Sequence, residues 1–142
     1  VEPLAEVLLR LGCRHVLVVH GEDGLDEISI GAPTLVAEGR DGRVRSYTIA
    51  PEDFGLTRAP LDAIRVGSPA ESLAVIRRVL ADEAGPARDI VVLNAGAAIH
   101  VAGLAATLAE GVARAQAVIA SGAAAGKLDQ LVSCTRRLRD TE

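Results

Sequence analysis

The sequence of 142 residues has very few aromatic side chains, with one Tyr, one Phe and no Trp. Proteins that bind single-stranded nucleic acid stack the bases on aromatic rings, so a protein of that class is not expected. Basic residues are not in excess either, because the formal net charge is −4 at pH 7. A binding face built from Lys and Arg is therefore disfavoured, and we expect no nucleic-acid partner.

Long apolar runs and metal-binding cysteine spacings are also missing. The sequence has no signal peptide and no apolar run of about 18 residues, which predicts a cytoplasmic protein with no membrane partner. Cys13 and Cys134 lie near opposite ends, and neither belongs to a C-x-x-C or Cys/His motif. A zinc site is therefore not expected, and both cysteines are predicted to be small buried hydrophobic residues. Because the sequence opens at Val1 without Met, we expect it to begin partway through a larger protein.

The strand-forming segments all lie in the first half of the sequence. Residues 15–20 are apolar on both faces and rich in Val, which predicts a buried, parallel strand. Residues 34–38 and 43–49 flank an Asp-Gly turn and predict an antiparallel hairpin. An amphipathic helix is predicted before them, over residues 1–11.

The second half of the sequence has the start signals of helices. Ser68 and Thr107 each stand three residues before a Glu, which is the spacing of a capping box. The helix that Ser68 opens is predicted to turn Leu73 and Ile76 inward. A last helix is predicted from about residue 123 to residue 139. Hydrophobic residues make up 49% of the chain, enough for the core of one domain.

Residues 86–103 are ambiguous by periodicity alone. Ile90-Val91-Val92-Leu93 favours a strand by propensity, whereas Pro86 at the start and the inward spacing of the apolar residues favour a helix. With either outcome the sequence predicts the α/β class. The expected architecture is a partial α/β domain with a buried parallel strand, an antiparallel hairpin and a helical C-terminal half.

Two adjacent carboxylates, Asp26 and Glu27, follow the glycine-containing turn after the predicted strand. Ligands of open α/β sheets bind beyond the carboxyl ends of strands. Mg²⁺ prefers oxygen ligands and is held through one or two carboxylates together with water and substrate phosphates. Taken alone, the pair also fits a solvated surface pair or a charge pair at a helix N-terminus, and that alternative stays open here.

The remaining polar candidates are predicted to have structural roles. No acid or nucleophile is linked by spacing to His15, His20 or His100, although His20 ends the strand beside the carboxylate pair. Asn94 lies in an apolar stretch and is expected to hydrogen-bond a loop backbone from inside the core. No nucleophile elbow, phosphate-binding P-loop or dinucleotide fingerprint is present, so no catalytic residue is assigned.

Several short motifs occur in the order found in one enzyme family. They are VVHG at 18–21, DGLDEIS at 23–29, Pro33-Thr34, PEDFGL at 51–56, Gly85-Pro86, Arg88-Asp89, Asn94, Ala102-Gly103, Gly111-Val112 and Ser121-Gly122. In this respect the sequence resembles anthranilate phosphoribosyltransferase over essentially its whole length. The resemblance is to the C-terminal portion of the large α/β domain of that family, which implies one domain over residues 1–142.

The resemblance implies a reaction and a metal. The family transfers the phosphoribosyl group from phosphoribosyl diphosphate to anthranilate in tryptophan biosynthesis, and it releases pyrophosphate. Asp26 and Glu27 correspond to ligands of the Mg²⁺ that accompanies phosphoribosyl diphosphate, and no substrate-binding residue is assigned on this chain. The complete enzymes are homodimers with an N-terminal half that this sequence lacks. The resemblance also favours a helix over residues 86–103.

Two alternatives remain beside the transferase. Pyrimidine nucleoside phosphorylases share the architecture but lack the DGLDEIS stretch, and a non-catalytic structural or interaction fragment would need no metal. For the transferase, we expect the chain to be inactive without the missing N-terminal half. We also expect it to expose an apolar sheet edge where that half belongs.

Overall fold

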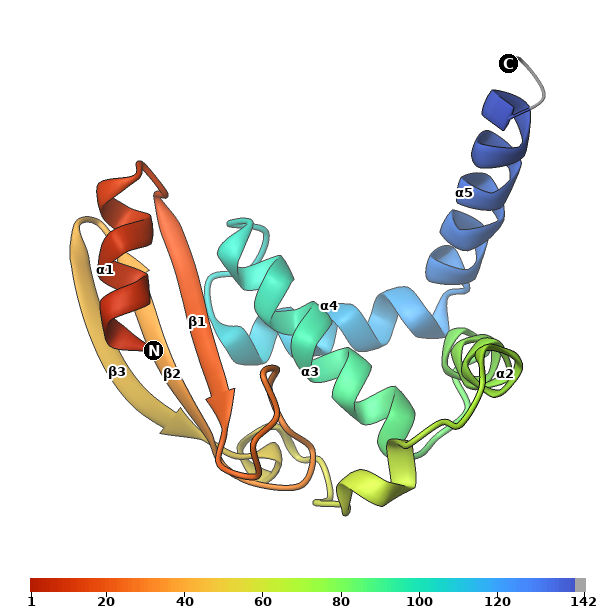
Figure 1. Cartoon of the computed structure of the whole chain (residues 1–142), viewed down its shortest axis with the longest axis horizontal. Coiled ribbons are helices and arrows are strands. Elements are labelled where there is room, and N and C mark those ends of the chain that lie inside the picture. The colour runs from red at the N-terminus through yellow and green to blue at the C-terminus, as the bar shows by residue number, and fades with distance from the viewer. Residues whose placement is uncertain (140–142) are drawn as a thin grey trace.

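A three-stranded sheet and one helix form the first half of the chain in a computed structural model, which describes residues 1–139. The helix α1 spans Glu2–Arg10, and the strands are β1 (His15–Gly21), β2 (Thr34–Arg40) and β3 (Arg43–Ile49). The sheet order is β1-β2-β3, and both pairs are antiparallel. Helix α1 packs against all three strands, on the face turned away from the helical half (Figure 1).

The predicted hairpin is confirmed, with strands that reach closer to the turn. Arg40 pairs with Arg43, so only Asp41 and Gly42 form the connection. Both residues have positive φ, at 51° and 75°, which a two-residue turn matched to the twist of the strands requires.

The first strand differs from its expected pairing. Within residues 1–139 its partner is β2, which runs antiparallel to it, and its other edge has no partner. Residues His15–Val19 are half-buried rather than fully buried. Two apolar faces indicate that a strand is covered on both sides, but they do not encode the direction of its neighbours, so parallel pairing did not follow from the pattern.

The second half is helical, as predicted. It contains two short 3₁₀ helices, η1 (Pro51–Phe54) and η2 (Leu61–Ile64), followed by α2 (Pro69–Leu80), α3 (Pro86–Val101), α4 (Leu108–Ala120) and α5 (Ala123–Arg139). The ambiguous segment is therefore a helix, with Pro86 in its first turn. Helix α3 lies between the sheet and the other helices, and α5 projects away from them (Figure 1).

Both predicted helix starts are confirmed. The Ser68 hydroxyl accepts a hydrogen bond from the Glu71 N–H at 3.2 Å, and Thr107 accepts one from the Glu110 N–H at the same distance. Each Glu side chain reaches back one residue further than a capping box requires. It accepts from the N–H of Gly67 or Ala106, respectively. The bonds to Ser68 and Thr107 satisfy N–H groups that the first turn of a helix leaves unpaired, and those from Gly67 and Ala106 fix the residue before each cap.

Four residues that were predicted to be buried are exposed. Leu73 and Ile76 of α2 are 42% and 44% exposed, because no described element covers that face of the helix. Cys13 and Cys134 are both exposed free thiols, since the first follows the end of α1 and the second lies on the projecting α5.

No helix among the described residues combines the length and the apolar character needed to cross a membrane.

Helices α3 and α4 cross at two glycines. A Cβ atom on Gly96 would lie 2.6 Å from the Val112 nitrogen, and a Cβ on Gly111 would collide with the Gly96 carbonyl oxygen. The atoms in the way are backbone atoms, which cannot swing aside as a side chain can. The contact between the two helices therefore depends on glycine at both positions.

We expect Gly111→Ala to destabilise the protein by about 3 kcal/mol or more, because overpacking against backbone forces the helices apart. The matched control is Gly126→Ala in α5, where an added Cβ meets nothing within 4 Å. That change should stabilise by up to about 1 kcal/mol, since Ala favours the helix over Gly. Urea unfolding measures both. Equal stabilities of the two variants would contradict the close approach of α3 and α4.

Candidate functional site

The loop between β1 and β2 carries the predicted metal ligands. Asp26 and Glu27 lie on residues 22–33, directly after β1, and both side chains are exposed. Within residues 1–139 neither carboxylate makes a hydrogen bond or an ion pair, so their oxygen atoms are available to a ligand. The structure thus places both residues together at one end of the sheet, on the loop that the sequence pattern indicated.

Asn94 of α3 holds this loop, as the sequence predicted. Its side-chain oxygen accepts from the Ile28 N–H at 3.0 Å, and its Nδ2 donates to the Ile28 carbonyl at 2.9 Å. Nδ2 also donates to the Ile90 carbonyl of its own helix at 3.0 Å. The residue next to Glu27 is therefore tied on both sides of its backbone to a buried helix.

A second set of hydrogen bonds closes the loop from within. The Ser29 hydroxyl donates to Asp23 Oδ2 at 2.6 Å and accepts from the Gly31 N–H at 2.9 Å. The Thr34 hydroxyl accepts from the Ser29 N–H at 3.0 Å. A Cβ on Gly21 would lie 2.7 Å from Asp23 Oδ1, so the loop folds tightly over that glycine.

Sequence reasoning missed the roles of Asp23, Ser29 and Thr34. Ser29 and Thr34 are buried at 0% and 1% exposure, next to Ile28 and Ile30 of the core. The available signal was the presence of short polar side chains between buried apolar residues, because such groups must find partners nearby. The Asp23 carboxylate accepts hydrogen bonds within the loop, so its role is structural, unlike the one predicted for Asp26 and Glu27.

The residues present fit a hard divalent cation. The two free carboxylates offer oxygen ligands of the kind that Mg²⁺ prefers, and the hydrogen bonds of Asn94 and Ser29 hold the backbone that carries them. Adjacent side chains diverge, so the pair is suited to bind a hydrated ion from two directions or to hold two ions. His20, the other candidate near this loop, is exposed at the end of β1.

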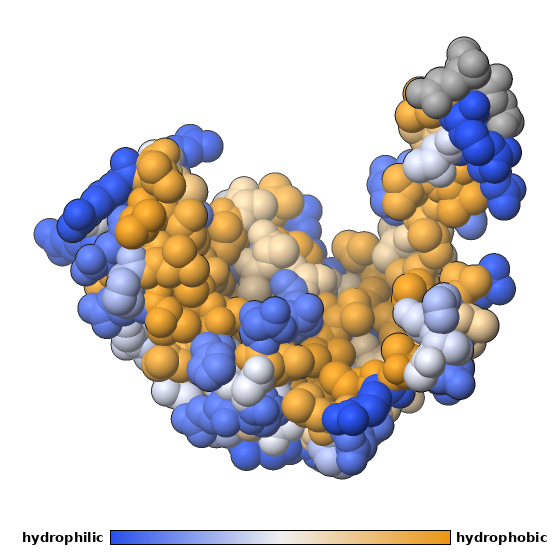
Figure 2. Space-filling view, in the orientation of Figure 1, coloured by the Kyte–Doolittle hydropathy of each residue, from blue (hydrophilic) through white to orange (hydrophobic). Residues whose placement is uncertain are grey.

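An apolar groove of about 450 Å³ adjoins the loop. Leu25 and Glu27 line it on the side of the loop, and α2 and α3 contribute Ile76, Val79 and Val91. Figure 2 shows apolar surface extending over β1 and across the hollowed face of the molecule. Glu27 of the carboxylate pair therefore borders a wide, uncovered apolar face.

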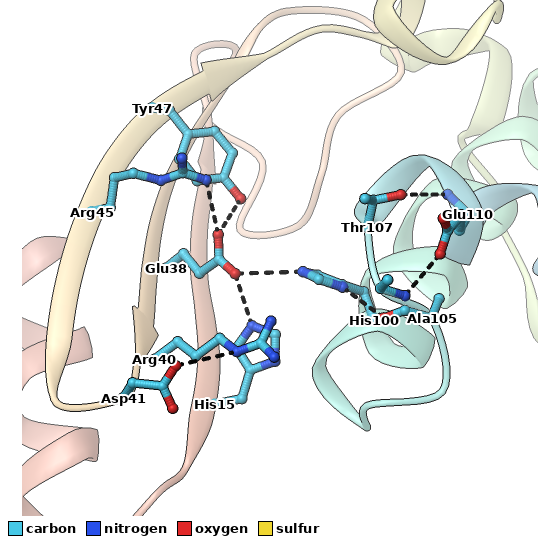
Figure 3. Close-up of polar contacts among 11 residues, drawn as sticks. His15, Glu38, Arg40, Asp41, Arg45, Tyr47, His100, Ala105, Thr107 and Glu110 are labelled. Carbon is cyan, nitrogen blue, oxygen red and sulfur yellow. Dashed lines mark hydrogen bonds and ion pairs between the residues drawn. The ribbon is translucent and has the colours of Figure 1, made fainter.

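Another polar cluster joins the sheet to α3 and was not foreseen (Figure 3). Glu38 Oε1 lies 2.9 Å from His15 Nε2 and 3.4 Å from His100 Nε2. Burial alone raises the pKa of Glu38, but hydrogen bonds from His15, Tyr47 and His100 outweigh it and lower the pKa below its ordinary value. Burial, and then the charge of Glu38, raise the pKa of Tyr47 to about 12.

We expect Asn94→Ala to cost about 1–3 kcal/mol of stability, because it leaves backbone groups of Ile28 without partners. Hydrogen exchange at the Ile28 amide should accelerate with it, which reports the loosened loop directly. The control is Gln130→Ala, which removes an exposed amide from α5 and should change stability by less than about 0.5 kcal/mol. Unchanged exchange at Ile28 would show that Asn94 does not hold the loop.

Comparison with known proteins gives one consistent family. The sequence model of the glycosyl transferase family, a/b domain, matches residues 1–125. An anthranilate phosphoribosyltransferase of Thioalkalivibrio sulfidiphilus is 66% identical over 134 residues, which cover 94% of this chain and 40% of the relative. The chain thus spans less than half the length of this curated relative.

Solved structures of the same enzyme share the fold. The anthranilate phosphoribosyltransferase of Thermus thermophilus aligns with a TM-score of 0.85 and 46% identity, over 94% of this chain and 39% of the other. A Saccharomyces cerevisiae variant of the enzyme, solved with Mg bound, aligns with a TM-score of 0.71 and 25% identity. That alignment covers 81% of this chain and 34% of the yeast chain.

Proposed function

We propose a transferase function from one premise: the chain belongs to the glycosyl transferase family, a/b domain. In this proposal, residues 1–142 are the C-terminal portion of the α/β domain of an anthranilate phosphoribosyltransferase. The observation that carries it is the hydrogen-bonded loop with two carboxylates that have no partner within residues 1–139, in a chain 66% identical to such an enzyme over 134 residues.

The proposed reaction replaces one bond at the anomeric carbon of the ribose. The bond from that carbon to the pyrophosphate oxygen breaks, a bond to the anthranilate nitrogen forms, and the amine loses a proton. Negative charge develops on the leaving pyrophosphate. Mg²⁺, when bound, would neutralise part of that charge.

This chain contributes the loop that holds the ion. Asp26 and Glu27 would be its protein ligands, and Asn94, Asp23 and Ser29 would keep the loop in one conformation. Such preorganisation matters because a metal ligand that must first be ordered loses part of its binding free energy. The Mg bound in the yeast variant supports the choice of ion.

The uncovered apolar face supports the proposal that residues outside this chain, which the longer relatives contain, pack against it. We propose that residues preceding this chain in a complete enzyme cover the free edge of β1 and the groove beside the loop. They would also supply the contacts to the diphosphate and to anthranilate. The chain covers 40% of the Thioalkalivibrio enzyme, so more than half of that enzyme is available for these roles.

The test is a chimera of the N-terminal part of the Thioalkalivibrio enzyme and this chain. Anthranilate fluorescence is followed after addition of phosphoribosyl diphosphate and Mg²⁺. We expect a loss of anthranilate fluorescence that requires the chimera, phosphoribosyl diphosphate and Mg²⁺ together. The undivided Thioalkalivibrio enzyme, measured alongside, should behave in the same way. A chimera that is folded by circular dichroism but leaves the fluorescence unchanged would reject the transferase and favour the non-catalytic fragment.

The chain on its own is expected to self-associate, because the free edge of β1 and the apolar face are open to solvent. Light scattering across a concentration series measures this. The variant Val18→Lys places a charge on the edge strand and should lower the associated fraction, whereas Gln130→Lys at an exposed polar position of the projecting α5 should not. A monomer at every concentration would contradict the proposed covering of β1.

A further inference from the structure

We propose that His15, Glu38 and His100 form a binding site for a divalent transition-metal ion of the Zn²⁺ type, distinct from the carboxylate loop. The site does not rest on the proposed transferase function. Their ligating atoms all lie within 4.8 Å of one another. They come from β1, β2 and α3, so an ion bound there would connect the sheet to the helical half (Figure 3).

The three side chains are withdrawn from solvent. Their exposures are 10% for His15, 12% for Glu38 and 6% for His100. Two imidazole rings and one carboxylate are a recurrent ligand set for Zn²⁺, with a further position left for water. Burial also limits competition from bulk water, which favours a bound ion over an exposed cluster of the same residues.

The hydrogen bonding of His100 supplies the main argument. Its Nδ1 lies 3.1 Å from the Ala105 carbonyl oxygen, which can only accept, so Nδ1 carries the hydrogen. Nε2 is therefore the ring nitrogen that faces Glu38 Oε1, at 3.4 Å. A cation held between these two atoms would replace this single contact with two bonds.

The surrounding residues orient the ligands as metal sites require. Ligating histidines donate their second N–H to a carbonyl or carboxylate, which here is the contact between His100 and Ala105. Glu38 is held through its other oxygen, which accepts from the Tyr47 hydroxyl at 3.1 Å and from Arg45 at 3.4 Å. Arg45 is 77% exposed, so solvent screens its repulsion of a cation.

The distances leave room for an ion after small movements. Bonds of about 2.0–2.2 Å in a tetrahedral site place the ligand atoms roughly 3.3–3.5 Å apart. The separations from Glu38 Oε1 are 2.9 Å and 3.4 Å, and all three ligand atoms lie within 4.8 Å of one another. Binding would therefore need His15 to withdraw slightly from Glu38 and the three atoms to converge on the ion. A groove of about 420 Å³, lined by Glu38, His100 and Thr107, gives access from solvent.

Zn²⁺ binding to the full 142-residue chain tests the proposal, measured by competition with a chromophoric chelator at low protein concentration. Both cysteines are first replaced by serine, as Cys13→Ser and Cys134→Ser, so that exposed thiols do not contribute. We expect one ion per chain with a micromolar or tighter Kd. Co²⁺ in place of Zn²⁺ should give the visible absorption of a tetrahedral site.

His100→Gln and Glu38→Gln should each weaken Zn²⁺ binding by at least about tenfold, because each removes a ligand, and losing a residue that only orients a ligand already costs that much. The control His20→Gln removes an exposed histidine of β1, the strand that carries His15, and should leave the Kd unchanged. Circular dichroism checks that each variant is folded, and His15→Asn replaces any variant that is not. Zn²⁺ binding that is absent, or equally strong in all folded variants, would overturn the site.

Discussion

The double variant Asp26→Asn/Glu27→Gln will lose at least about 100-fold in kcat/KM in the chimeric transferase. Both substitutions keep the shape of the side chains but remove the charges that would hold Mg²⁺. The exposed position of both carboxylates, without partners in the described residues, means that the fold does not depend on them. The loss should therefore appear in turnover and leave the melting temperature within a few degrees.

A control for charge accompanies that experiment. Asp41→Asn/Asp129→Asn removes the same two charges from the hairpin turn and from α5, away from the loop. Asn tolerates the positive φ of position 41, so the turn should persist. We expect this control to retain most of the activity. If both double variants lose activity equally, general electrostatics and not a metal site at Asp26 and Glu27 is responsible.

The second large effect is the absence of turnover in the chain alone. The groove beside the loop is uncovered, and Ile76 and Val91 on its walls are 44% and 41% exposed. Transfer of a phosphoribosyl group needs a site that excludes water and fixes both reactants, because otherwise the electrostatic and orientational gains are lost. With the isolated chain, the anthranilate fluorescence should change no faster than in a reagent mixture without protein.

Two observations separate inactivity from an artefact. The chimera, prepared and assayed in parallel, must be active under the same conditions, and the isolated chain must show the circular dichroism of a folded α/β protein. Turnover by the isolated chain that scales with its concentration, and that disappears in Asp26→Asn/Glu27→Gln, would contradict the dependence on further residues.

Local signals predicted most of the elements. The Asp-Gly turn positioned the hairpin, and Ser68 and Thr107 marked two helix starts, because each of these signals acts within a few residues. For residues 86–101, propensity and periodicity disagreed, and the family resemblance favoured the helix that the structure shows. Strand direction was not encoded locally, and β1 pairs antiparallel to β2.

Contacts between distant residues were harder to predict. The role of Asn94 followed from its chemistry, since a polar side chain in an apolar stretch needs partners, although its partner Ile28 is 66 positions away. The cluster around Glu38 did not follow, because His15 lies 23 positions from it and the third member comes from α3. No spacing rule links residues that meet only through the packing of sheet and helix.

Binding of Mn²⁺ tests the central claim most directly, since this ion substitutes for Mg²⁺ at oxygen ligands and is seen by electron paramagnetic resonance. The chimera is titrated with Mn²⁺ in the presence of phosphoribosyl diphosphate, with and without Asp26→Asn/Glu27→Gln. The account predicts bound Mn²⁺ in the unsubstituted chimera and at least about tenfold weaker binding in the double variant. Equal binding in the two proteins would contradict the assignment of the loop as the metal site.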